Sequence, residues 1–125
     1  MKEIIATPDA PKAVGPYSQG VRAKGFIFTA GQVGLVPATG KFAGEDLATQ
    51  ARQAMHNIKA VLEAAGSSLD KIVKTTIFMV DLGEFKTVNA IYAEFFAGDP
   101  PARSTVQVAA LPLGALVEIE TIALL

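Results

Sequence analysis

The sequence predicts an α+β fold in which two helices cover one face of a mixed β-sheet, and three observations lead to this prediction. Apolar residues recur at helical spacing over 45–65 and again over 84–96. Between these stretches, the run IVKTTIFMV at 72–80 is β-branched and nearly free of charge, as is typical of a buried strand. Strand patterns also precede the first helix and follow the second. The expected order is therefore β-β-α-β-α-β-β, with the second face of the sheet left uncovered.

The length and composition predict one domain, spanning residues 1–125, that associates with copies of itself. A chain of 125 residues is long enough to bury a hydrophobic core. Its residues are 50% hydrophobic and only 18% charged, against a usual charged share of about 25%, so few charges remain to cover an isolated molecule. We therefore expect a homo-oligomer that buries the uncovered face of the sheet.

Charge and cysteine content exclude several kinds of site and partner. The formal net charge is -1 and no run of lysine or arginine occurs, so we expect no nucleic acid partner. The sequence has no cysteine, which excludes disulfides, thiolate catalysis and metal sites built on cysteine sulfur. No segment offers the roughly 20 apolar residues that span a bilayer, and residues 1–12 lack a signal-peptide pattern. We expect a cytoplasmic protein with no membrane partner.

The first third of the chain predicts short strands joined by tight turns. Residues 2–6 are expected to form an edge strand, and the proline-rich segment after it excludes regular structure. The turn GPYSQG at 15–20 presents an aromatic ring and polar side chains where they could lie at the rim of a ligand site. A strand pair follows at 21–30, turning at Lys24 and Gly25, and the glycines of GQVG at 31–34 indicate a bulge or a close backbone approach.

The middle of the chain predicts helix, strand and helix in succession. Gly66 is expected to terminate the first helix. The strand at 72–80 is expected to be central and covered on both faces. The second helix carries an aromatic stripe, and Asn89 lies on that stripe four residues after Phe85.

The last stretch, 103–124, predicts a buried β-hairpin that contains one arginine and two glutamates. Two prolines precede Arg103, so the first strand begins near this residue, and the turn falls at 111–115. Alternation places Arg103 and Thr105 on one face of the first strand. On the return strand, alternation places Glu118 and Glu120 together on a mostly apolar face.

Arg103 and Glu118 are the sharpest candidate pair for chemistry. A guanidinium binds a carboxylate through two parallel hydrogen bonds, and a glutamate in partly apolar surroundings has a raised pKa that suits proton transfer near neutral pH. An interface salt bridge is an equally frequent use of such a pair. In the predicted hairpin, they are offset by four residues, or roughly 13 Å, so a small substrate or a neighbouring subunit must connect them.

The remaining polar candidates each have a structural alternative. Glu120 lies two residues from Glu118 and could be mistaken for the working carboxylate. A tyrosine in the place of Tyr17 more often packs against neighbours than contacts a ligand, and an asparagine in the place of Asn89 more often hydrogen-bonds a nearby backbone group. His56 is the only histidine and lies among polar helix positions, which favours a solvated side chain over a metal ligand. No catalytic triad and no glycine-rich phosphate loop can be assembled.

Five segments together closely resemble the RidA/YjgF family, and they cover nearly the full chain in order. They are GPYSQG at 15–20, FTAGQVG at 28–34, TVNAIYAEFF at 87–96, PPARSTVQVAALP at 100–112 and VEIETIA at 117–123. The resemblance implies a chorismate-mutase-like α+β fold and a homotrimer whose sheets form an inner barrel, with three clefts between subunits. It also implies cofactor-free hydrolysis of 2-imino acids, such as 2-iminopropanoate and 2-iminobutanoate, to 2-oxo acids and ammonia.

The resemblance also implies roles for particular residues. Arg103 would bind the substrate carboxylate, and Glu118 would activate water and later protonate the departing ammonia. Tyr17 and Asn89 would line the pocket, and backbone groups near Gly31 and Thr105 would orient substrate and water. All six of these residues lie within the five segments that carry the resemblance.

Two residues depart from the commonest family pattern, and two other functions compete with imine hydrolysis. Ala30 stands where many members have serine, and Thr105 where many have cysteine. The first change removes a hydroxyl that could contact substrate. A non-enzymatic protein of the same fold that binds a small carboxylate or a partner is the main alternative. Ribonuclease activity, also ascribed to members of the family, is disfavoured by the pI of 5.8 and the single histidine.

Overall fold

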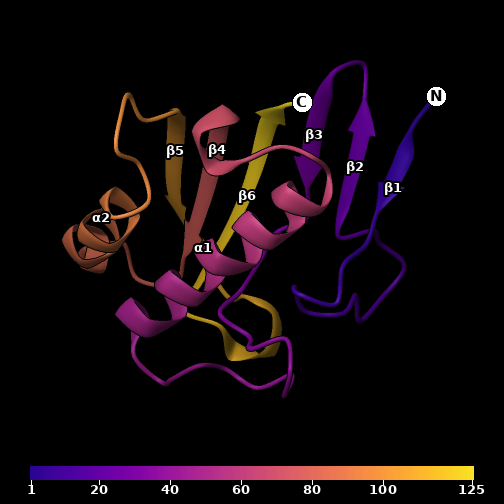
Figure 1. Cartoon of the computed structure of the whole chain (residues 1–125). Coiled ribbons are helices and arrows are strands. Elements are labelled where there is room, and N and C mark those ends of the chain that lie inside the picture. The colour runs from indigo at the N-terminus through magenta and orange to yellow at the C-terminus, as the bar shows by residue number, and fades with distance from the viewer.

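A single six-stranded sheet carries two helices on one of its faces (Figure 1). In the computed structural model, which describes residues 1–125, the strand order is β1-β2-β3-β6-β4-β5. Both helices, α1 (Leu47–Ala64) and α2 (Phe85–Ala93), lie on the same side. The strands are β1 (Glu3–Ile5), β2 (Gly20–Ala23), β3 (Phe26–Thr29), β4 (Ile72–Met79), β5 (Ala102–Gln107) and β6 (Val117–Leu124). The predicted α+β class and the two helices on one face are confirmed.

The N-terminal strands form an antiparallel meander. The predicted edge strand is β1, which pairs with β2, and β2 pairs with β3. Between β2 and β3 the chain turns at Lys24 and Gly25, whose φ angles of 52° and 81° both lie in the left-handed region. A two-residue turn with positive φ at both positions matches the twist of the flanking strands. The predicted strand pair and its turn are therefore confirmed.

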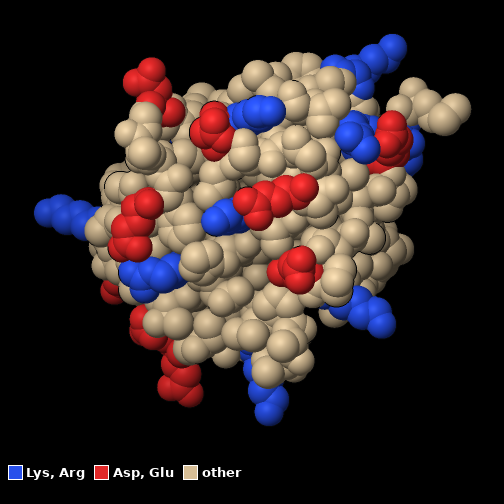
Figure 2. Space-filling view, viewed as in Figure 1, with Lys and Arg blue, Asp and Glu red and all other residues tan.

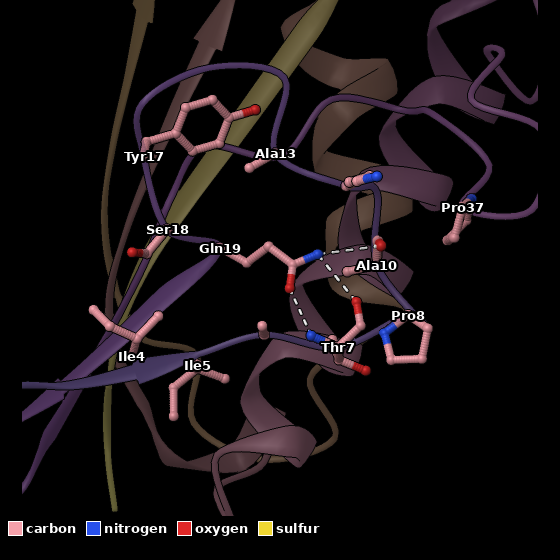
Figure 3. Close-up of a pocket in the computed structure, with 12 residues that line it drawn as sticks. Ile4, Ile5, Thr7, Pro8, Ala10, Ala13, Tyr17, Ser18, Gln19 and Pro37 are labelled. Carbon is pink, nitrogen blue, oxygen red and sulfur yellow. Dashed lines mark hydrogen bonds between the residues drawn. The ribbon is translucent and has the colours of Figure 1, made fainter.

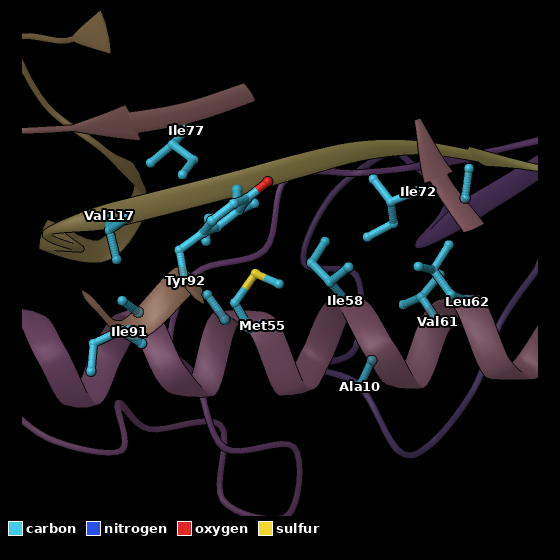
Figure 4. Packing of buried hydrophobic residues seen from close by; sticks show 14 of the residues in the cluster. Ala10, Met55, Ile58, Val61, Leu62, Ile72, Ile77, Ile91, Tyr92 and Val117 are labelled. Atoms are coloured by element: carbon cyan, nitrogen blue, oxygen red, sulfur yellow. The ribbon is translucent and has the colours of Figure 1, made fainter. Parts of the chain in front are cut away.

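Helix α1 begins and ends near the predicted positions because its caps are encoded locally. The Asp46 carboxylate accepts a hydrogen bond from the backbone N–H of Thr49, which satisfies one free donor of the first turn. At the other end, Gly66 has a φ of 84° just after the C-cap residue Ala65, as the sequence predicted. The buried face of α1, with Met55, Ile58 and others, points toward the sheet (Figure 4).

Helix α2 ends three residues before the predicted boundary at residue 96. The backbone N–H groups of Glu94, Phe95 and Phe96 each bond to the carbonyl three residues earlier, so the chain tightens there into consecutive turns. Its N-terminus follows a single 3₁₀ turn, Leu82–Glu84. Boundaries of this kind depend on tertiary packing more than on helical periodicity.

The predicted hairpin between 103 and 124 is wrong, because β4 lies between its two strands. Strand β5 runs parallel to β4, while β6 runs antiparallel to the other edge of β4. In this order both edges of β4 are paired, whereas a β5–β6 hairpin beside β4 would leave one edge of β4 open. Arg103 is consequently in register with Thr75 and not with residue 122.

Strand β4 is covered on one face only, which corrects the prediction that it is covered on both. Ile77 and Met79 are fully buried beneath the helices, whereas Phe78, on the opposite face, is partly exposed. We call this opposite side of the sheet the open face. Its exposed large hydrophobic residues include Phe26, Phe28, Val106 and Leu124.

The helix side of the molecule has a different surface. Acidic and basic side chains are interspersed there (Figure 2), and one ion pair, between Arg52 and Glu94, links the two helices at 3.1 Å. Neither helix is long and apolar enough to span a membrane.

Candidate functional site

The predicted site residues form two groups that lie on opposite faces of the sheet. Glu118, Tyr17 and Gly31 line one cavity of about 290 Å³, which we call the glutamate hollow. Arg103 and Asn89 line another cavity of about 310 Å³, which we call the arginine pocket. Thr105 lines neither of these cavities.

The glutamate hollow forms where the chain after β3 continues antiparallel alongside β6, the strand that carries Glu118. Gln32 and Ile119 exchange two backbone hydrogen bonds of 2.8 and 3.0 Å, and this pairing places Gly31 over the Glu118 side chain. A Cβ atom at residue 31 would lie 2.7 Å from Cδ of Glu118. The close backbone approach predicted from the two glycines is confirmed, and a side chain at position 31 would force the Glu118 side chain to move.

The surroundings of Glu118 favour its neutral form. Burial raises the pKa of the Glu118 carboxyl, and the negative charge of Glu120 on the same strand raises it further. Carboxyl groups with raised pKa values exchange protons with water at a pH closer to neutral. Glu118 is thus suited to act first as a base and then as an acid.

Tyr17 lies on an irregular loop, and one buried side chain holds that loop in place. The Gln19 amide accepts a hydrogen bond from the Thr7 N–H at 2.7 Å and donates to the carbonyls of Thr7, Ala10 and Pro11. Figure 3 shows the bonds to Thr7 and Ala10. Gln19 lies two residues after Tyr17 and binds backbone groups between Thr7 and Pro11, so it holds the two sides of the loop together. The burial of Gln19 was not predicted from the sequence, because glutamine usually lies at the surface.

The arginine pocket forms between β5 and α2. Arg103 donates a hydrogen bond of 2.6 Å from Nη2 to Oδ1 of Asn89. Its guanidinium carbon lies 5.3 Å from the ring centre of Phe85 and 4.9 Å from that of Tyr92. No carboxylate pairs with Arg103, since the two ion pairs of the structure are Arg22 with Glu3 and Arg52 with Glu94.

One chain does not bring Arg103 and Glu118 together. Arg103 is in register with Thr75, which is in register with Thr121 on β6, and Glu118 lies three residues from Thr121. An odd offset places the two side chains on opposite faces. Their backbones are separated by about 10 Å along the strands and about 10 Å across them. An Arg103–Glu118 salt bridge is therefore not made within the chain.

The two positions that depart from the family pattern differ in their surroundings. Ala30 lines the glutamate hollow, and its backbone N–H donates to the Gln19 carbonyl at 2.9 Å. Thr105 lies two residues from Arg103 on the same strand, and its buried hydroxyl has no hydrogen-bond partner. At Ala30, the glutamate hollow therefore lacks the hydroxyl group that a serine would supply.

His56 is exposed on α1, where its ring meets that of Phe95 edge-on at 5.3 Å. No group of three or more histidine, cysteine, aspartate or glutamate side chains is arranged to hold a metal ion.

Comparison with known proteins decides the family. The model of the endoribonuclease L-PSP family matches residues 7–125. A Salmonella typhimurium protein named 2-iminobutanoate/2-iminopropanoate deaminase is 50% identical over 126 residues, which cover 98% of each protein. The chain belongs to the RidA/YjgF family. The family predicted from the five sequence segments is thus confirmed.

Other members of the RidA/YjgF family extend the comparison. Reactive Intermediate Deaminase A, chloroplastic, of Arabidopsis thaliana is 51% identical over 124 residues, which are 99% of this chain and 66% of the plant protein. The crystal structure of E. coli TdcF with bound serine matches with a TM-score of 0.95 and 44% identity, covering 98% of each chain. Named deaminases are thus among the relatives at about half identity.

Proposed function

We propose that this chain hydrolyses reactive 2-imino acids, such as 2-iminopropanoate and 2-iminobutanoate, to 2-oxo acids and ammonia. The observation that carries the proposal is the pairing of two incomplete half-sites. The glutamate hollow holds a carboxyl group with a raised pKa, and the arginine pocket holds a guanidinium without an acidic partner. The names of the Salmonella and Arabidopsis relatives support the same reaction.

In the proposed mechanism, Arg103 binds the substrate carboxylate and so places the imine carbon near Glu118. The substrate reacts in its protonated, iminium form, and the ionised Glu118 accepts a proton from water as the water oxygen bonds to the iminium carbon. Glu118 then returns this proton to the amino nitrogen of the tetrahedral intermediate. As the carbon–nitrogen bond breaks, the hydroxyl group of the intermediate gives its proton to Glu118, ammonia leaves and the 2-oxo acid remains; Glu118 then passes this proton to ammonia and is ionised again. Water is the only co-reactant, and no electrons are transferred.

Four further residues complete the proposed site. Tyr17 would form a wall of the glutamate hollow, and Asn89 would line the arginine pocket beside Arg103. Backbone groups at Gly31 and Thr105 would orient substrate and water. The exclusion of a side chain at residue 31 supports this role for Gly31, because a substrate atom can then approach its backbone.

We further propose that the site is assembled between subunits of a homotrimer. The half-sites of one chain lie on opposite faces, so the glutamate hollow of one subunit would meet the arginine pocket of the next. The exposed hydrophobic side chains of the open face support burial of this face against other copies.

The test generates 2-iminobutanoate from threonine with a threonine dehydratase and measures ammonia release with and without the protein. We expect the protein to accelerate release. Arg103→Lys keeps the charge but loses the planar fork, so its kcat/KM should fall by about 10- to 100-fold. Glu118→Gln should lose kcat while the Kd for 2-oxobutanoate stays within about twofold. His56→Ala is the control and should match the unmodified protein.

The second candidate function is a protein that binds small carboxylates without turning them over. The serine bound in the related TdcF structure favours it, because serine is itself a small amino acid with a carboxylate. Saturable binding of 2-oxobutanoate without any acceleration of ammonia release would select this function.

Equal turnover by Arg103→Lys and the unmodified protein would contradict the assignment of Arg103 as the group that binds the substrate carboxylate.

A further inference from the structure

We propose that Tyr92, held by Thr75, is a positioning residue that orients the Arg103 guanidinium for carboxylate binding. The inference rests on the proposed role of Arg103 as the carboxylate anchor and assigns the groups that aim it. Neither Tyr92 nor Thr75 is among the residues predicted from the family motifs.

The hydrogen bonds of Arg103 leave its orientation under-determined. A guanidinium has five N–H donors, and within the chain Arg103 uses one of them, toward Asn89. A carboxylate partner would fix the group, but it would also occupy the fork that a substrate needs. The orientation must therefore come from contacts that leave the N–H edge free.

The ring of Tyr92 supplies such a contact. Its centre lies 4.9 Å from the guanidinium carbon, well within the range of a cation–π interaction. A guanidinium that rests on a ring face is held by its flat side, so its donors remain available. Tyr92 is 6% exposed, whereas Phe85, the other ring near Arg103, is 38% exposed. The more buried ring is the better-fixed support.

Tyr92 is itself fixed at both of its ends. The ring packs against Phe96 with centres 4.7 Å apart, and the hydroxyl forms a 2.8 Å hydrogen bond with the Thr75 hydroxyl. Figure 4 shows the Tyr92 side chain rising from α2 with its oxygen toward the sheet. Burial raises the pKa of the Tyr92 hydroxyl, so the ring stays neutral beside the arginine.

The partner of that hydrogen bond lies next to Arg103 in the sheet. Thr75 on β4 and Arg103 on β5 are directly in register, and Thr75 is fully buried. The ring is therefore tied to the strand position beside the one that carries the guanidinium. Each of the three residues is thus linked to the other two. Thr75 is paired with Arg103 in the sheet and hydrogen-bonded to Tyr92, and the Tyr92 ring contacts the Arg103 guanidinium.

The test measures carboxylate preference, because general damage to the fold would weaken all ligands alike. Calorimetry gives the Kd of 2-oxobutanoate and of its uncharged amide, 2-oxobutanamide, for each variant. In Tyr92→Leu we expect the preference for the carboxylate to fall about tenfold, with KM raised more than kcat is lowered. Tyr92→Phe and Thr75→Val keep the ring and remove the hydrogen bond. Each should lower the preference about two- to threefold, and combining them should add nothing further.

Val88→Ala is the matched control, since it creates a buried defect on the same helix. It should leave the carboxylate preference unchanged. An unchanged preference in Tyr92→Leu would overturn the proposal, and so would additive losses in the combined variant. If Tyr92→Leu does not fold, the Tyr92→Phe and Thr75→Val pair decides alone. If the protein releases no ammonia but its preference for the carboxylate still depends on Tyr92, only the proposed imine hydrolysis is overturned. An unmodified protein that binds neither ligand would overturn both proposals.

Discussion

At the scale of single residues, the behaviour of Glu118 is set by its two nearest influences. Burial and the charge of Glu120 both raise the pKa of Glu118, and both disfavour its ionised form. A base must be ionised to accept a proton from water, so the proposed role of Glu118 predicts that activity is lost as pH falls through this pKa. In a plot of kcat/KM against pH, the fall in rate on the low-pH side, here called the acidic limb, should therefore reflect the pKa of Glu118.

Replacing Glu120 with glutamine should shift that limb to lower pH. The substitution removes the negative charge and leaves the burial of Glu118 in place, so the pKa of Glu118 should fall toward its ordinary value but not reach it. The measurement is kcat/KM against pH. Glu63→Gln, an exposed change on α1, serves as the control. A limb that stays in place, or moves to higher pH, would show that Glu118 is not the titrating base.

Gly31 offers a steric test of the same hollow. In Gly31→Ala, the added Cβ would lie 2.7 Å from Cδ of Glu118, so the carboxyl group must move. A displacement of about 1 Å at a reacting group costs roughly 100-fold in rate, and we expect a loss of that order in kcat/KM. Glu63→Gln, an exposed change on α1, again serves as the control. Full activity in Gly31→Ala would be incompatible with Glu118 acting from its present position.

At the scale of elements, the wall of the glutamate hollow depends on Gln19. The segment it holds has no helix or strand of its own between β1 and β2, so four hydrogen bonds to one amide replace a regular backbone ladder. The same segment supplies Pro11, Lys12 and Val14 to the lining of the hollow. A change at Gln19 should therefore act on the site from a distance.

We expect Gln19→Met to lower the free energy of unfolding by about 1–3 kcal/mol, because buried carbonyl groups lose their donor. Limited proteolysis should then cut within residues 7–14 before the rest of the chain. Gln50→Met is the matched control, since Gln50 is also buried and holds other backbone groups, at Gly44 and Leu116. Early cleavage at the same place in both variants would contradict a local role for Gln19.

At the scale of the whole molecule, the proposed association of copies depends on the open face. Its aromatic and aliphatic side chains are exposed in one chain, while the helix side carries interspersed charges (Figure 2). Phe28→Lys places a charge at the middle of the open face, beside Ile122 on the neighbouring strand. The expected result in sedimentation is a fall in mass from that of an oligomer toward 13.0 kDa, with loss of activity in parallel.

Leu82→Lys provides the comparison, because Leu82 is about equally exposed but lies in the short turn before α2. It should keep both mass and activity. An active monomer of Phe28→Lys would contradict a site assembled between subunits.

The sequence by itself determined the local elements of this protein and its family. Caps at Asp46 and Gly66 and the turn at Lys24 and Gly25 follow from short-range preferences, so their positions were predictable. Alternation along β6 likewise placed Glu118 on the face opposite the core, because a strand alternates whatever its partners are. These features need only neighbours within a few residues.

Only the tertiary structure decided which strands are paired and which side chains meet. Inserting β4 between β5 and β6 separated Arg103 from Glu118 and brought Arg103 next to Thr75 and Tyr92. Burial of Gln19 was decided in the same way, by a loop that folds back onto β2. Strand order and loop packing depend on hydrogen bonds and contacts between residues far apart in the chain. No local pattern encodes them, because many pairings satisfy the same alternation.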